Sequence, residues 1–327
     1  MYEAYPYPTP IAGEGLIGDV ANMVAFLLPA GFLSGKRILD AGCGTGHRVL
    51  GLAKRWPQAQ FLGIDFSKAS LRVARTLADQ HRIENVQFQQ GDLMALEPSQ
   101  EFDLIVSTGV IHHLEDPGKG LANLSRCLAP GGHIILWLYH PYGEFSRLLE
   151  RELVLTLWDR EKMSFADGIE MMRALRVSLS RDRYSGAIAQ KDNQVLNDAS
   201  INVDGFLHPI VNAYRFHEAF AMLAQCGLHW VAVHSINLGN NSKLIDLGQV
   251  SKPSLRMFCL KESDLFQSTS IGARYRDLAN AQKLKVIELL MKPNGFSVIA
   301  GRTDAYSTLD ERIRGNLVHL NAEFAVR

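Results

Sequence analysis

The sequence predicts an α/β protein with a seven-stranded, mostly parallel sheet flanked by helices. Between residues 36 and 145, short apolar runs alternate with segments whose apolar residues recur at helical spacing. The runs are nearly continuous in apolar character, which is typical of parallel strands that helices cover on both faces. Glycine or an acidic residue follows several of the runs. Because ligands of such sheets bind beyond the carboxyl ends of the strands, we expect a site along that edge.

The individual elements follow from local patterns. The first five strands are expected at 38–40, 60–65, 86–90, 102–107 and 133–139. Ser67 is expected to cap one helix, and a second helix carries Leu121, Leu124 and Leu128 on one face and ends within 128–132. Later in the chain, we expect a helix at 216–226 that ends before Gly227, a strand at 228–236, a helix at 279–291 and a last strand at 295–300.

The remaining segments define the expected domain organisation. Residues 1–35 are predicted to form an N-terminal segment, with a proline-spaced opening at 5–10, over the cofactor cleft or on the surface, and a helix near 18–28. Residues 36–145 form the core. Residues 146–205 are expected to be a mainly helical insertion after strand 5, with a polar loop at 186–204. Residues 206–327 return to the core and add a C-terminal extension.

The loop after the first strand carries the most informative motif. Gly42, Gly44 and Gly46 follow Asp40 at every second position, and glycine lets the backbone approach a nucleotide-like ligand closely. The spacing differs from the Gly-x-Gly-x-x-Gly of dinucleotide-binding folds. Asp40 would repel a pyrophosphate but attract a cationic amino-acid group. Asp65 ends the second strand, roughly 20 residues after the glycine loop, where a carboxylate can accept both ribose hydroxyls.

These motifs together resemble those of class I S-adenosylmethionine-dependent methyltransferases, in particular the bacterial type 11/12/25-like members. The resemblance covers residues 36–145, extends more loosely to 236, and includes the phrases GVIHHLEDP at 109–117 and LAPGG at 128–132. It implies a Rossmann-like sheet and S-adenosyl-L-methionine as the cofactor. It also implies that Asp92 binds the adenine amine. The cofactor-binding residues implied are Asp40, Ala41, Gly42, Cys43, Gly44, Gly46, Asp65, Phe66, Gly91, Asp92, Leu93, Thr108 and Gly109.

Four histidines are the candidate catalytic residues. A methyltransferase needs a general base only when its acceptor is protonated at the working pH. In the resembling family, the loop that holds His112 and His113 lies beside the reactive methyl group, although either ring could pack structurally instead. His140 ends the fifth strand, where it could touch substrate or simply close the sheet. His208 lies four residues after Asp204, and the two could form an acid–base pair or serve structure alone.

Composition narrows the classes of function. The chain has 34 basic and 34 acidic residues, and this balance argues against a nucleic-acid partner. Its four cysteines are dispersed, which suits a reducing cytosol and offers no zinc framework, and Asp204 and His208 lack the further ligands that a metal needs. We expect a cytoplasmic protein with no membrane association, because no signal peptide or apolar stretch long enough to span a bilayer is visible. The sequence allows a homodimer but does not determine the oligomeric state.

The sequence therefore predicts an enzyme that transfers the methyl group of S-adenosylmethionine to an oxygen or nitrogen of a small-molecule acceptor. Two alternatives share the same motifs: a noncatalytic S-adenosylmethionine-binding regulatory module, and a methyltransferase that acts on a protein or RNA. An NAD-dependent oxidoreductase or an aminopropyl transferase agrees less well with the motifs. A deep enclosed pocket would favour a small-molecule acceptor, whereas an open groove would favour a polymer.

Overall fold

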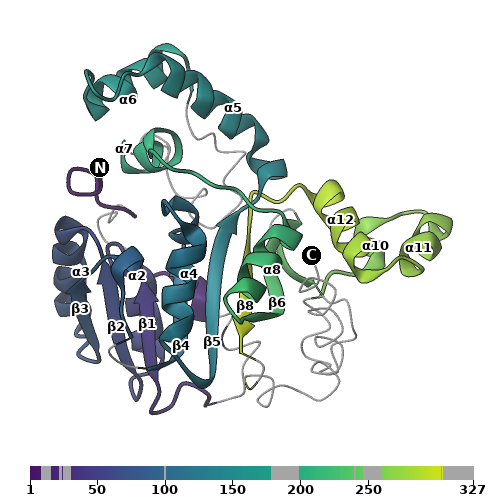
Figure 1. The fold of residues 1–327 in the computed structure, drawn as a ribbon, viewed down its shortest axis with the longest axis horizontal. Coiled ribbons are helices and arrows are strands. Elements are labelled where there is room, and N and C mark those ends of the chain that lie inside the picture. The colour runs from purple at the N-terminus through teal and green to yellow at the C-terminus, as the bar shows by residue number, and fades with distance from the viewer. Residues whose placement is uncertain are drawn as a thin grey trace.

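The structure, a computed structural model, describes residues 1–8, 16–21, 24, 31–98, 101–177, 199–238, 241–245, 259–302 and 304. Its centre is an eight-stranded sheet with the order β3-β2-β1-β4-β5-β8-β6-β7 (Figure 1). The strands are β1 Arg37–Ala41, β2 Gln60–Asp65, β3 Val86–Gln90, β4 Phe102–Thr108, β5 Leu128–Tyr139, β6 His229–Leu238, β7 Asn241–Ile245 and β8 Gly295–Gly301.

The sheet is parallel in its first half and antiparallel in its second. Strands β1 to β5 pair in parallel. Strand β8 then lies between β5 and β6 and is antiparallel to both, and β7 pairs antiparallel with β6. The predicted fold class is confirmed, with one strand more than the seven expected. The additional strand is β7, which the sequence analysis did not include.

One boundary differs from the expectation. The fifth strand begins at Leu128, so the segment 128–132 that was expected to end a helix is already part of β5. The preceding helix, α4 Pro117–Arg126, ends two residues earlier. Phe102 of β4 pairs with Leu128, and the register then shifts before Leu104 pairs with His133. Gly131, with a φ of 72°, adopts the left-handed conformation within this irregular stretch.

Helices that flank the sheet bury one face against it. They are α2 His47–Arg55, α3 Lys68–His81, α4, α8 Phe216–Gln225 and α12 Asn280–Met291. The hydroxyl of Ser67 accepts a hydrogen bond from the backbone N–H of Ser70 at the start of α3, as the sequence predicts. Fully buried side chains from strands and helices, among them Ile38, Leu104, Phe216 and Phe296, form one continuous core. This core fixes the carboxyl ends of β1 to β4 relative to one another.

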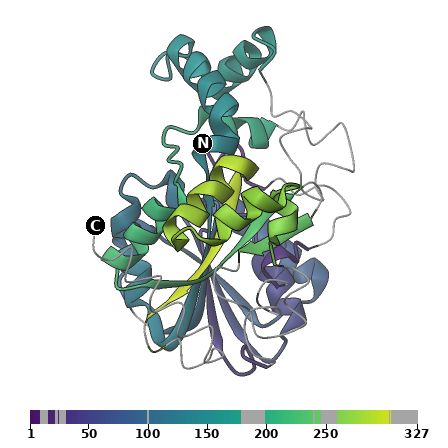
Figure 2. The same cartoon turned by 90° about the vertical axis from the view of Figure 1, so that its right-hand side faces the viewer.

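A smaller helical unit follows β5 and projects from the sheet (Figures 1 and 2). It consists of α5 Pro141–Leu157, α6 Phe165–Ala174, α7 Ala199–Asn202 and the short π-helix η4 Val203–Leu207. Val154, Trp158, Met172 and Phe206 form its own core, and Tyr5 of the N-terminal segment packs against that cluster. The N-terminus therefore lies between this helical unit and the sheet.

The apolar pattern of α5 does not mark its buried face. Phe145, Leu149, Leu153 and Leu157 share one side of the helix, and their side chains are 46–62% exposed. Buried positions on α5 are instead Glu144, Arg147 and Val154. The short helices α10 Glu262–Leu265 and α11 Thr269–Arg276 precede α12.

Several expected segments fall partly outside the described residues. Of the helix expected near 18–28, residues 19–21 and 24 are helical, residue 18 is not, and 22, 23 and 25–28 lie outside the described residues. Positions 9 and 10 of the N-terminal opening and 186–198 of the expected loop lie outside as well, whereas 199–204 are helical rather than loop.

Candidate functional site

A cavity of about 310 Å³ opens at the carboxyl ends of β1 to β4, the edge that the sequence predicts for a ligand. Residues that are far apart in the chain meet there, including Tyr2 and Tyr7 near the N-terminus and His208 beyond the helical unit. The expected cofactor residues that line it are Asp40, Gly42, Cys43, Gly44, Asp65, Phe66, Gly91, Asp92, Leu93, Thr108 and Gly109. Of the expected catalytic residues, His113 and His208 line it. Ala41, Gly46, His112 and His140 are not part of its wall.

The glycines of the first loop are required by its geometry. Gly42, Gly44 and Gly46 have φ angles of 81°, 53° and 83°, which side chains disfavour. A Cβ atom on Gly44 would lie 2.3 Å from the carbonyl oxygen of Tyr7, and one on Gly42 would lie 2.4 Å from Val110 Cγ2. Gly46 occupies the N-cap position of α2 behind the loop. The loop is therefore pressed against its neighbours, and its backbone forms the floor of the cavity.

Asp65 holds this loop in place. Its Oδ2 accepts a hydrogen bond of 2.8 Å from the backbone N–H of Gly44, and its Oδ1 accepts one of 2.9 Å from that of Ser67. Burial raises the pKa of Asp65, and these two hydrogen bonds oppose the shift. Each carboxylate oxygen has a further lone pair, so Asp65 can still accept hydroxyl groups from a ligand.

Asp40 is a buried acid at the cavity wall, with an exposed fraction of 3%. Burial raises its pKa to about 7, while Arg48 lowers the pKa, and Asp65 and Asp19 raise it further. A ligand with a positive charge near Asp40 would stabilise the ionised carboxylate. Asp40 is therefore suited to the ammonium group of an amino acid.

The third acid, Asp92, begins the short helix η1 Leu93–Ala95, where its Oδ1 accepts a hydrogen bond of 2.8 Å from the N–H of Met94. Phe66 also lines the cavity, although 72% of its side chain is exposed, and can cover a flat ring. A Cβ atom on Gly109 would meet nothing within 4 Å, so the cavity is open at that position. Three acids on successive strand ends, with an exposed aromatic ring between two of them, fit a ligand with an ammonium group, a ribose and a purine.

Two histidines in the cavity wall pack against each other. The ring centroids of His113 and His208 are 4.1 Å apart, and their planes are tilted by 37°. His113 Nδ1 lies 2.7 Å from the carbonyl oxygen of Ile210, to which it donates. His208 Nδ1 lies 3.0 Å from the backbone N–H of the same residue, from which it accepts. Ile210 thus contacts both rings through its own peptide groups.

Asp204 and Tyr2 extend this group of residues. Tyr2 Oη donates a hydrogen bond of 2.6 Å to Asp204 Oδ1, and the same oxygen lies 3.9 Å from His113 Nε2. Both Asp204 and His113 are nearly fully buried. Burial raises the pKa of Asp204, and the hydrogen bond from Tyr2 and the charges of His208 and Arg147 lower it. Sequence reasoning named Asp204 beside His208, but it did not foresee that His113 and Tyr2 would join them.

His112 is a buried packing residue in this structure. Its ring stacks on Tyr139, with centroids 4.1 Å apart, and neither ring nitrogen has a hydrogen-bond partner among the described residues. Burial lowers its pKa well below the ordinary value, and the charges of His113 and Arg147 add to this effect. Its carbonyl oxygen accepts hydrogen bonds from the backbone and side chain of Asn212. This placement does not support the catalytic role expected for His112.

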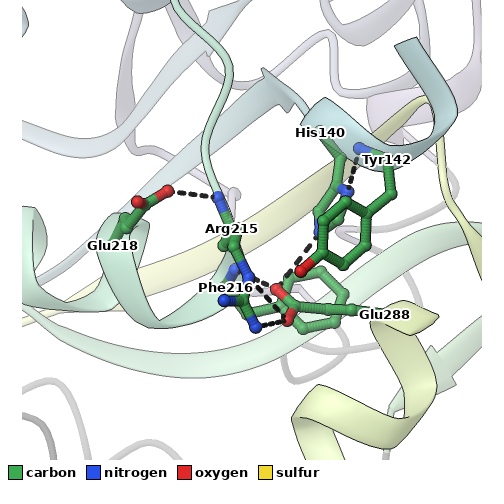
Figure 3. A network of polar contacts seen from close by, with 6 residues as sticks. All are labelled: His140, Tyr142, Arg215, Phe216, Glu218 and Glu288. Carbon is green, nitrogen blue, oxygen red and sulfur yellow. Dashed lines mark hydrogen bonds and ion pairs between the residues drawn. The ribbon is translucent and has the colours of Figure 1, made fainter. Parts of the chain in front are cut away.

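His140 serves the packing of the second half of the sheet (Figure 3). Its Nε2 lies 3.1 Å from Glu288 Oε1, and its Nδ1 accepts a hydrogen bond from the N–H of Tyr142 at the start of α5. Glu288 also accepts hydrogen bonds from Arg215 and from the backbone of Phe216. Both ring nitrogens of His140 are thus engaged outside the cavity, so the structure does not support the catalytic role expected for it.

Comparison with known proteins identifies the class. A family described as a methyltransferase domain matches residues 32–166. The chain is 35% identical over 293 residues to an uncharacterized protein of Synechococcus, an alignment that spans 84% of this chain and 66% of that protein. It is 38% identical over 115 residues to trans-aconitate 2-methyltransferase of Azoarcus, covering 35% of this chain and 44% of that enzyme. It is 35% identical over 132 residues to ubiquinone biosynthesis O-methyltransferase of Acinetobacter baylyi, an alignment that covers 39% of this chain and 55% of that enzyme.

A solved structure shares the fold. The structure of PKMT2 from Rickettsia typhi matches with a TM-score of 0.59 at 16% identity, over 86% of this chain and 52% of that one. Across the curated relatives above, the chain spans between 44 and 66% of their length.

Residues 32–166 thus form a methyltransferase domain, and the fold and these relatives support a class I S-adenosylmethionine-dependent methyltransferase with S-adenosyl-L-methionine as the cofactor. Within the described residues, no group of three or more histidine, cysteine or acidic side chains could hold a metal ion. None of the helices in the described part of the chain combines the length and apolar character needed to cross a bilayer.

Proposed function

We propose that the protein is a methyltransferase that moves the methyl group of S-adenosylmethionine to an oxygen or nitrogen atom of a small-molecule acceptor by in-line displacement. When bound, the cofactor supplies a methyl carbon attached to a positively charged sulfur. The protein's task is then to orient the acceptor, exclude water and accept a proton where the acceptor carries one. The observation that carries the proposal is a single cavity whose wall contains Asp40, Asp65 and Asp92 together with His113 and His208.

The cofactor would occupy the part of the cavity formed by the first three strand ends. Asp40 would hold its ammonium group, Asp65 its ribose hydroxyls and Asp92 its adenine amine, with the loop of Gly42 and Gly44 beneath. The acceptor would then lie toward the histidines.

The N-terminal segment forms part of the cavity wall, which supports a small acceptor over a polymer. Tyr2, Tyr7 and Pro8 line the cavity from the N-terminal side, and Thr45 anchors this segment. The N–H of Thr45 donates to the carbonyl of Tyr7, and its hydroxyl donates to that of Pro8 at 2.6 Å. The Azoarcus and Acinetobacter relatives, whose names denote trans-aconitate and ubiquinone-biosynthesis methyltransferases, support the same class of acceptor. A regulatory module without catalysis, or an enzyme acting on a protein or RNA, is the alternative.

The first test is calorimetric titration of the full chain with S-adenosylmethionine, S-adenosylhomocysteine and NAD in parallel. We expect micromolar binding of both adenosyl ligands and none of NAD. Binding of NAD alone would contradict the proposal. Transfer of a labelled methyl group to members of a small-molecule library, compared with transfer to peptides and RNA, then separates the classes of acceptor. Adenosyl binding without transfer to any acceptor favours the regulatory alternative.

A further inference from the structure

The residue Ile210 gives the two cavity histidines opposite hydrogen-bonding characters. Its carbonyl oxygen can only accept, so His113 must carry its proton on Nδ1, and the neutral ring presents Nε2 as an acceptor. Its backbone N–H can only donate, so His208 Nδ1 must be unprotonated, and the neutral ring carries its proton on Nε2 as a donor. One residue thus fixes a free acceptor on one ring and a free donor on the other.

Both free nitrogens belong to side chains that line the cavity. His113 Nε2 is buried and has no hydrogen-bond partner among the described residues, which is costly unless a ligand supplies one. The two rings are in contact, with centroids 4.1 Å apart, so a ligand group that approaches one ring lies beside the other. Both rings are neutral at pH 7, because burial lowers the pKa of His113 to about 4 and that of His208 to about 3.

We propose that His113 and His208 form a recognition pair for a hydroxyl group, which makes the protein an O-methyltransferase. This inference rests on the proposed function and names its acceptor. A hydroxyl donates its proton to His113 Nε2 and accepts a hydrogen bond from His208 Nε2–H, and its oxygen keeps a second lone pair for attack. A neutral amine has only one lone pair, so accepting from His208 would leave none for attack. A carboxylate has no proton for His113 and would lie near the carboxylate of Asp204.

The reaction balances with these groups alone. The hydroxyl oxygen forms a new bond to the methyl carbon, the carbon–sulfur bond breaks, and its electron pair stays on sulfur. The hydroxyl proton passes to His113 Nε2 and later leaves to solvent. The oxygen becomes strongly acidic as its new bond forms, so a base with a low pKa is sufficient and remains unprotonated at neutral pH. Asp204, 3.9 Å from Nε2, stabilises the imidazolium that results.

The test reads the tautomers directly, by long-range proton–nitrogen NMR of the full chain labelled with ¹⁵N-histidine in the presence of S-adenosylhomocysteine. His113→Gln and His208→Gln assign the two signals, and His217→Gln, at an exposed position on α8, is the matched control. We expect an Nδ1–H ring for His113 and an Nε2–H ring for His208 between pH 6 and pH 8. The same tautomer on both rings, or an imidazolium on either ring in this range, would overturn the proposal.

Three matched probes then test selectivity: phenol, aniline and benzoate, which place different groups on one ring. We expect phenol to shift the Nε2 signals of both histidines at a lower concentration than either other probe. His208→Leu should weaken phenol binding about fivefold, whereas His208→Gln, whose amide can still donate, should restore most of it. A larger response to aniline or benzoate, or none to phenol, argues against a hydroxyl acceptor. Calorimetric binding of S-adenosylhomocysteine is measured in the same variants, so loss of the cofactor site is seen separately.

Discussion

Replacing Asp65 tests how the cofactor loop and the cofactor depend on one carboxylate. In Asp65→Ala, the backbone N–H groups of Gly44 and Ser67 lose their acceptor. Hydrogen bonds to a charged group contribute about 1.5–3 kcal/mol each, so we expect the free energy of unfolding to fall by about 3 kcal/mol. The ligand loses the same acceptor for its hydroxyls. The loss of two hydrogen bonds from the ligand hydroxyls, at about 1.5 kcal/mol each, costs about 3 kcal/mol of binding free energy. We therefore expect the affinity to fall more than about 100-fold.

The assay is calorimetric titration with S-adenosylhomocysteine, combined with urea unfolding of each variant. Asp65→Asn keeps one carbonyl oxygen and should lose affinity by about tenfold. His113→Gln is the control, because His113 follows β4 whereas Asp65 ends β2, and this variant should stay within about threefold of the parent chain. The reasoning is refuted if Asp65→Ala binds within threefold of the parent, or if His113→Gln loses as much affinity as Asp65→Ala.

Three further changes probe other parts of the structure. Gly44→Ala places a Cβ atom 2.3 Å from the Tyr7 carbonyl, so cofactor binding measured by calorimetry should be lost; unchanged binding would mean that the loop differs from this structure. Glu288→Ala leaves His140 and Arg215 without their shared carboxylate and should lower stability in urea by about 3 kcal/mol; a change below about 1 kcal/mol would contradict this. The pKa of Asp40 is raised to about 7 in the folded chain, so the folded state holds a proton that the unfolded chain releases above about pH 4. The free energy of unfolding without ligand should therefore fall by up to about 4 kcal/mol as the pH rises toward 7. Urea unfolding of Asp40→Asn should not show this dependence on pH.

Much of the first half of the fold could be predicted from the sequence, because buried parallel strands are continuous apolar runs and each ends at a recognisable residue. The start of β5 could not: Pro130, Gly131 and Gly132 are typical of a turn, yet here they lie in an irregular strand whose register shifts. Strand β7 is a short segment, Asn-Ser-Lys-Leu-Ile, whose polar residues do not predict a strand without its partner β6.

The cofactor end of the site was more predictable than the acceptor end. Its residues follow successive strands, so topology alone brings them together. The acceptor end depends on contacts across long separations: Tyr2 reaches Asp204 from 202 residues away, and Ile210 contacts His113 over 97 residues. Local patterns carry no record of such contacts, and the sequence therefore could not separate His113 and His208 from His112 and His140.

The position of β8 in the sheet has a consequence for how the chain is built. This strand, Gly295–Gly301, is buried at every residue and joins β5 to β6. Until β8 is synthesised, the open edge of β5 and the β6–β7 hairpin have no strand between them. Exposed strand edges of this kind favour pairing with other chains, and contacts over long separations form slowly. Completion of the sheet therefore waits for β8, and the exposed strand edges make the chain most prone to aggregation before that strand is in place.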